Sequence, residues 1–246
     1  MSKPNMPSLL DLVRLSRPTL AESIDAMAEH LLRPPPAVSY QRARSLVRQA
    51  LSHSAPWTAL SAACDAAKRL AERPMTAEVI RLVWQLGEGR SIQSYKLTDK
   101  RLTVPDGRFR LRRDVMVSVP VDFLYVENKS TTFFWAQFRK TYALSDIQIA
   151  VLAAVFKRAY LDECDDPADL EIFDLSAPVG SKRRDPRLLR IADFPAMPES
   201  TIVDVLQRSI DAFDAICARD IDWSEARASR RSTPTEKANS DQSSFF

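Results

Sequence analysis

The sequence predicts an α+β fold in which an N-terminal helical bundle precedes a mixed, mainly antiparallel sheet with packed helices. Segments in the first third of the 246 residues repeat apolar side chains at helical spacing. From residue 90 the chain is rich in Val, Phe, Tyr and Thr and is interrupted by turn sequences, which is typical of antiparallel strands. Strands and helices do not alternate regularly, as they would in a βαβ protein. We therefore divide the chain into a helical module (1–89), an α+β domain (90–223) and a polar, disordered tail (224–246).

The helical module contains a segment from residue 19 to residue 32 that carries both a start and a stop signal. Thr19 is a candidate N-cap, and Glu22 three residues later completes the sequence pattern of a capping box. The prolines Pro34 to Pro36 lack the N–H group that a helix needs and end the segment. Three more amphipathic helices are predicted at 39–52, 56–72 and 76–88. We expect these helices to pack together as one bundle.

The α+β domain begins with three or four antiparallel strands between residues 94 and 138, separated by the turn sequences PDG and NKS. A core helix is predicted at 145–161, with Ser145 as its N-cap. Asp146 lies in the first turn of this helix, where a carboxylate interacts favourably with the helix dipole. Two strands and a last amphipathic helix follow at 169–176, 187–194 and 200–221.

The composition excludes several common functions. The formal charge of +3 is nearly balanced, so any basic surface for a nucleic acid has to be local. Cys64, Cys164 and Cys217 are dispersed and form no CxxC pair, which is typical of reduced thiols in an intracellular protein. Two histidines are too few for a histidine-rich zinc site. None of the four glycines falls in a phosphate-binding loop, which excludes the common kinase, ATPase and Rossmann classes.

The sequence shows no sign of secretion or membrane insertion. Its first residues lack an apolar core followed by a small-residue cleavage site. No run of about 18 apolar residues occurs along the chain. We expect a soluble, cytoplasmic protein with no membrane partner.

Residues 76–176 resemble the core of a known superfamily. Their predicted order is helix, three-strand meander, helix and strand, and the segment VDFLYVENKSTTFFWAQFRKTY (121–142) holds candidate acids and lysines. This layout is similar to that of the PD-(D/E)XK nucleases, in particular their RecB-like members. The resemblance implies an acid on the second strand and a (D/E)xK triplet on the third, which together hold Mg²⁺ and activate water. Side chains two residues apart on a strand share one face, which explains the spacing of the triplet.

The superfamily pattern fits the sequence in two registers, of which the first uses the triplet ENK. In this register Glu127 and Lys129 share one strand face, and Asp114 is the upstream acid. The resemblance then implies that Asp114 and Glu127 are the Mg²⁺ ligands. Glu88, which ends the preceding predicted helix, takes the place of the helix-borne acid that some members have.

In the second register Asp122 is the upstream acid, NKST forms a turn and Lys140 is the lysine of the third strand. Gln148 matches the glutamine on the helix of RecB-like members. Local chemistry favours this register, because NKS suits a turn and the aromatic segment after it suits a strand. The same register places Phe138 where the metal-binding acid belongs, so a nuclease built on it lacks a ligand. At this point both registers stay open.

Two groups of basic residues are candidates for contacts to nucleic-acid phosphates. In GRFRLRR three arginines alternate along one predicted strand face, and SKRRDPR is a loop between two predicted strands. The predicted phosphate-binding residues are Arg108, Arg110, Arg112, Lys182, Arg183, Arg184 and Arg187. The alternative for both groups is a solvated outer face that nearby acids balance.

These observations predict a nucleic-acid-associated protein with a PD-(D/E)XK-like core. Its expected partner is DNA or RNA. It is either a Mg²⁺-dependent endo- or exonuclease or a catalytically degenerate relative without a cofactor. The alternative prediction is a non-enzymatic scaffold protein whose helical module binds a protein partner.

Overall fold

The structure is a computed structural model and describes most of the chain. The described residues are 4–32, 39–99, 104–112, 115–141, 143–164, 167–178, 180–194, 196–219, 221 and 223. The described ranges contain seven α-helices, a mixed sheet of five strands and a separate sheet of two strands. The predicted α+β class is therefore confirmed.

The helices and strands are bounded as follows. The helices are α1 (Leu9–Leu15), α2 (Leu20–Leu32), α3 (Gln41–Leu51), α4 (Trp57–Asp65), α5 (Glu72–Gly87), α6 (Asp146–Phe156) and α7 (Glu199–Cys217). A π-helical turn, η1 (Lys157–Leu161), continues α6, and a 3-10 turn, η2 (Ile191–Asp193), follows β7. The strands are β1 (Gln93–Tyr95), β2 (Arg108–Arg112), β3 (Val115–Ser118), β4 (Phe123–Glu127), β5 (Ser130–Gln137), β6 (Ala168–Asp174) and β7 (Arg187–Arg190).

The main sheet has the strand order β1-β4-β5-β6-β7. Strand β4 runs antiparallel to both β1 and β5, β6 is parallel to β5, and β7 is antiparallel to β6. Helix α6 lies between the parallel strands β5 and β6 in the sequence, because a parallel connection needs a long crossover. The sheet is therefore mixed and mainly antiparallel, as predicted. Strands β2 and β3 pair only with each other in the described residues and form the second sheet.

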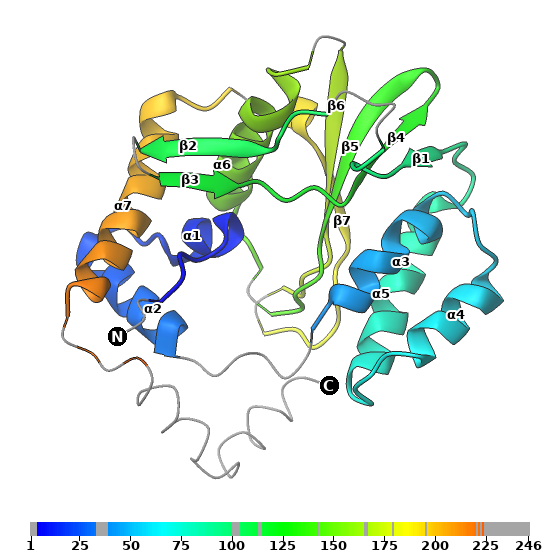
Figure 1. The fold of residues 1–246 in the computed structure, drawn as a ribbon, viewed down its shortest axis with the longest axis horizontal. Coiled ribbons are helices and arrows are strands. Elements are labelled where there is room, and N and C mark those ends of the chain that lie inside the picture. The colour runs from blue at the N-terminus through cyan, green and yellow to red at the C-terminus, as the bar shows by residue number, and fades with distance from the viewer. Residues whose placement is uncertain are drawn as a thin grey trace.

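The main sheet lies between two groups of helices (Figure 1). Side chains alternate between its two faces, as they do along any strand. Leu124 and Phe133 pack in a cluster with α1, α2, α6 and α7, whereas Phe123 and Phe134 pack in a cluster with α3, α4 and α5. The first five helices are thus divided between the two sides of the sheet and do not form one bundle. The reason is that α1 and α2 bury their apolar faces against α6 and α7, which come much later in the chain.

Two predicted helix starts are confirmed by their hydrogen bonds. The Thr19 N–H donates to the Glu22 carboxylate at 3.1 Å, and the Glu22 N–H donates to Thr19 Oγ1 at 3.2 Å. Ser145 and Gln148 form the same reciprocal capping box at the start of α6. The side-chain amide of Gln148 also donates to the carbonyl of Val13, at 3.4 Å.

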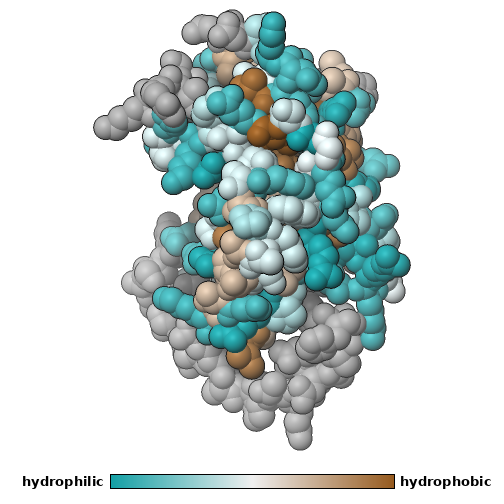
Figure 2. Space-filling model, turned by 90° about the vertical axis from the view of Figure 1, so that its right-hand side faces the viewer, coloured by the Kyte–Doolittle hydropathy of each residue, from teal (hydrophilic) through white to brown (hydrophobic). Residues whose placement is uncertain are grey.

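The side of the molecule formed by α3, α4 and α5 carries mainly hydrophilic and weakly polar side chains (Figure 2). Strongly apolar side chains on this face occupy small, separate areas. None of the helices in the described part of the chain is long and apolar enough to cross a membrane. The predicted disordered tail (224–246) and the prolines Pro34 to Pro36 lie outside the described residues.

Candidate functional site

The strand arrangement does not reproduce the first register. Asn128 and Lys129 form the two-residue turn between β4 and β5, with φ angles of 50° and 67°. Positive φ at both positions is the requirement of a tight hairpin turn, so Lys129 shares no strand face with Glu127. Asp114 lies outside the described residues. Strand β3, which begins at Val115, belongs to the separate sheet and does not pair with β4 in the described residues.

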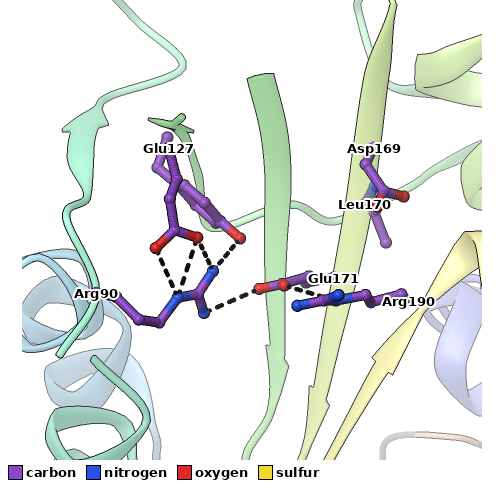
Figure 3. Close-up of polar contacts among 7 residues, drawn as sticks. Arg90, Glu127, Asp169, Leu170, Glu171 and Arg190 are labelled. Atoms are coloured by element: carbon purple, nitrogen blue, oxygen red, sulfur yellow. Dashed lines mark hydrogen bonds and ion pairs between the residues drawn. The ribbon is translucent and has the colours of Figure 1, made fainter. Parts of the chain in front are cut away.

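Glu127 instead belongs to a network of ion pairs that crosses one face of the main sheet (Figure 3). Arg90, from the segment between α5 and β1, donates to Glu127 through Nε at 3.2 Å and through Nη2 at 2.7 Å. Its Nη1 donates to Glu171 on β6 at 3.3 Å, and its Nη2 also donates to Tyr125 Oη at 2.7 Å. Arg190 on β7 donates to Glu171 from the other side, at 3.4 Å. We call these five residues the Arg90 network.

The Arg90 network combines two carboxylates with two guanidinium groups, so its formal charges cancel. The Glu171 side chain is only 3% exposed and that of Arg90 16% exposed. The hydrogen bond from Arg90 lowers the pKa of Glu127 below its ordinary value. Burial raises the pKa of the Tyr125 hydroxyl, and hydrogen bonding to Glu171 adds to this effect. Both carboxylates are therefore already bound by guanidinium groups. The network joins the segment after α5 to β4, β6 and β7 rather than presenting ligands to a metal.

Strand β4 and the turn after it fall where the second register expects a strand and a turn, but β5 ends at Gln137, so Lys140 lies beyond it. Asp122 directly precedes β4 and Phe138 directly follows β5, so both residues lie at the same end of the antiparallel pair. The Asp122 carboxylate accepts a hydrogen bond from Arg44 of α3 and another from the Ala136 N–H, at 2.8 Å. Its side chain is 4% exposed. Burial raises the pKa of Asp122, and the charge of Arg44 opposes this rise without cancelling it.

Arg44 occupies the space between the predicted acid and the aromatic residue that follows β5. Its guanidinium carbon lies 5.0 Å from the centroid of the Phe138 ring, at cation–π distance. The ring of Tyr40 stacks on the ring of Phe138, with 5.8 Å between the ring centroids. A guanidinium group thus supplies the positive charge beside Asp122. We call Asp122, Arg44, Phe138 and Tyr40 the Asp122 site.

The other predicted members of the second register do not join the Asp122 site. Lys140 is half-buried, and its carbonyl accepts a hydrogen bond from the Ala177 N–H at 2.7 Å. Within the described ranges Lys140 forms no ion pair with Asp122, whose partner is Arg44. Gln148 is the N3 partner of Ser145 in the capping box of α6. Of the predicted set, only Asp122 therefore lies in the Asp122 site.

These residues do not fit the Mg²⁺ ion that the resemblance implies. Mg²⁺ is held by several oxygen ligands, mainly carboxylates and water. The Asp122 site offers one carboxylate, which Arg44 already neutralises, and places the apolar Phe138 ring beside it. In the part of the chain that the structure describes, no group of three or more His, Cys, Asp or Glu side chains is arranged to hold a metal ion.

A further ion pair, between a partly exposed arginine and a buried acid, lies immediately after Phe138. Arg139 binds the carboxylate of Asp11 on α1 with both terminal nitrogens, one of them at 3.1 Å. Burial raises the pKa of Asp11, but the hydrogen bond and the charge of Arg139 outweigh burial, so the pKa lies below its ordinary value. Gln137 holds the turn at this strand end, because its Oε1 accepts from the Arg139 N–H at 2.6 Å.

The loop arginines have different environments. Lys182 and Arg183 are exposed, as a phosphate-binding role requires. Arg184 is only 5% exposed, and its guanidinium donates to Glu78 at 3.0 Å and to the carbonyls of Phe138 and Leu175. It is therefore not available to a phosphate on the surface, which corrects the prediction for this residue.

Arg187 and the arginines of β2 also include both residues held in ion pairs with other elements and residues that are exposed. Arg187 forms an ion pair with Asp174, which is fully buried, at 2.7 Å. Arg112 forms one with Asp214 of α7 at 3.0 Å. Arg108 and Arg110 are exposed on the same face of β2. Strand β2 and the loop before β7 lie in different parts of the molecule, so the two basic groups do not form one continuous surface (Figure 1).

The sequence carried a signal for only some of the residues that the structure brings together. Glu171 is an acid at an inward position of the apolar strand sequence DLEIFD, and a buried acid of this kind requires a cationic partner. Arg44 and Asp11 carried no such signal. Their partners lie 78 and 128 residues away in the sequence, so only the folded chain reveals the pairs.

Comparison of the chain with family models, with curated proteins and with solved structures finds no match in any of the three.

Proposed function

We propose that the chain is a nucleic-acid-associated protein whose core resembles that of the PD-(D/E)XK nucleases and which does not cleave its ligand. The observation that carries the proposal is the order α5, β1, β4, β5, α6 and β6, with Asp122 at the start of the middle strand of an antiparallel trio. This order is helix, antiparallel meander, helix and parallel strand, which is the layout on which the resemblance rests. The hairpin of β2 and β3 is an insertion between β1 and β4.

We infer the absence of cleavage from the residues of the Asp122 site, which leave no place for a catalytic metal ion. Metal-dependent hydrolysis needs a cation that activates water and stabilises the developing negative charge. At the Asp122 site Arg44 is bound where a cation would contact Asp122, and a guanidinium group cannot coordinate a water molecule as a metal does. The Phe138 ring replaces the second acid of the pattern. We therefore expect binding without hydrolysis.

The exposed basic residues support the binding half of the proposal. Lys182 and Arg183 lie in the loop after β6, which is hydrogen-bonded to the strand end at Phe138 through Arg184. Arg108 and Arg110 provide a second basic group on β2. Contacts to phosphates release counterions, so binding should weaken steeply as salt is raised.

Fluorescence anisotropy with a labelled duplex, measured over a series of salt concentrations, tests this proposal. We expect binding at low salt and a log–log slope that falls by about two when Lys182 and Arg183 are both replaced by serine. The double variant Arg108→Ser/Arg110→Ser shows in the same way whether β2 contributes. Absence of binding to duplex or single strand at low salt would refute the proposal and favour the protein-binding scaffold.

A further inference from the structure

A hollow on the protein surface is lined by residues of which the sequence indicated only Arg183 and Arg184 as candidates. It lies between α5 and the loop that precedes β7, and its volume is about 380 Å³. Pro74, Ala77 and Leu82 of α5 form one apolar wall, and Pro186 of the loop contributes to the other. Because two of these four residues are prolines, the walls lose little conformational freedom when a ligand binds.

The charges of the hollow are not balanced. Arg184 and Glu78 line it, but they bind each other at 3.0 Å and cancel. Arg81 and Arg183 also line it, and both are exposed. Neither of these two arginines forms an ion pair with another residue of the described ranges. Two uncompensated guanidinium groups therefore flank an apolar hollow.

Arg81 is oriented by an aromatic residue. Its guanidinium carbon lies 5.5 Å from the centroid of the Trp57 ring. A cation–π contact of this kind restricts the side chain while leaving its N–H donors free for an anion. Trp57 in turn packs edge-on against Trp84, with 6.0 Å between the ring centroids. The arginine is thus held at the rim of the hollow before a ligand arrives.

We infer that this hollow binds one unstacked nucleotide of a single-stranded nucleic acid. A nucleotide combines an anionic phosphate with a flat base whose faces are apolar, which matches two guanidinium groups beside apolar walls. The bases of a duplex are stacked and paired, so only a single strand can place a base in the hollow without unpairing. The inference rests on the proposed function and extends it, because it names single strands as the preferred ligand and Arg81 as a binding residue.

Two substitutions that the proposed function does not use test this inference. Arg81→Ser removes one guanidinium group, and Ala77→Trp fills the hollow with a large side chain. Lys68→Ser is the control of matched charge, since Lys68 is exposed in the segment between α4 and α5 and does not line the hollow. The probes are a fluorescein-labelled oligothymidylate of about 15 nucleotides and a duplex of equal length, both at low salt.

We expect the wild-type protein to prefer the oligothymidylate. Arg81→Ser and Ala77→Trp should each weaken its binding about tenfold, while Lys68→Ser and duplex binding change by less than about twofold. Thermal unfolding checks that the variants are folded, and Arg81→Ser remains informative if Ala77→Trp is not. An affinity for the oligothymidylate that Arg81→Ser leaves unchanged, or a preference for the duplex, would overturn this inference and leave the proposed function intact. If neither probe binds the wild-type protein, both proposals fail.

Discussion

Replacing Arg90 by alanine is expected to destabilise the protein strongly, because one guanidinium group holds two carboxylates of the main sheet. Arg90 donates to Glu127 and Glu171 and is itself 16% exposed. Removal of one partner from a buried ion pair typically costs about 3–5 kcal/mol, because a charge stays buried without compensation. Glu171 is 3% exposed but keeps Arg190 as a partner, and Glu127 is 22% exposed and can regain water. We therefore expect the lower end of that range, about 3 kcal/mol.

Urea denaturation followed by tryptophan fluorescence measures this loss, and two further variants locate its cause. Arg190 contacts the same Glu171, but the Arg190 side chain is 57% exposed. The variant Arg190→Ala should therefore cost less than about 1 kcal/mol. The double variant Arg90→Ala/Glu171→Gln removes the buried charge that only the exposed Arg190 still compensates, and should recover about 1–2 kcal/mol relative to Arg90→Ala. A cost of Arg90→Ala below about 1 kcal/mol, or no larger than that of Arg190→Ala, would refute the reasoning.

Three further predictions concern the strand ends, the pH dependence and the hairpin of β2 and β3. Arg184→Ala should cost at least about 3 kcal/mol in urea denaturation, because it leaves two buried carbonyls and Glu78 without their donor. The exposed neighbour Arg183→Ala should cost less than about 0.5 kcal/mol, and equal costs would contradict the interior position of Arg184. The pKa of Glu127 is lowered in the folded state, so its contribution to stability is present above its ordinary pKa of 4.5 and is lost as pH falls through the folded-state pKa. Glu127→Gln should therefore flatten the decline of the urea midpoint between about pH 5 and pH 3, and an unchanged decline would argue against the ion pair. Gly107→Ala should lower stability by at least about 1–2 kcal/mol, because φ at Gly107 is +62° and a Cβ atom would lie 2.1 Å from Tyr160 Oη; calorimetry showing an unchanged melting temperature would refute it.

The parts of the fold that local chemistry controls were predictable from the sequence. Thr19 starts its helix with the capping box that Glu22 indicates, and Ser145 is the N-cap of α6, as predicted. The turn between β4 and β5 falls at Asn128 and Lys129, because asparagine tolerates a positive φ better than most residues. This turn also favours the second register over the first. Short-range rules were sufficient in each case, since every decisive contact joins residues close in the sequence.

The parts that depend on distant contacts were not predictable. Nothing local indicates that β2 and β3 leave the main sheet, because strand partners are chosen by packing across the whole fold. The same applies to Arg44, whose contact with Asp122 spans 78 residues. Arg184 looked like its neighbour Arg183 in a basic loop. It is buried because two carbonyls at the ends of β5 and β6 and the Glu78 carboxylate need its donors.

Incubation with supercoiled plasmid is the most direct test of the central claim, which is binding without cleavage. The protein is mixed with plasmid at low salt in the presence of Mg²⁺ or Mn²⁺, and bound and nicked fractions are measured in the same samples. We predict a retarded, fully supercoiled plasmid, because Arg44 neutralises Asp122 and Phe138 provides no metal ligand. Metal-dependent nicking by the wild-type protein that disappears in Asp122→Asn would contradict the account and assign hydrolysis to the Asp122 site.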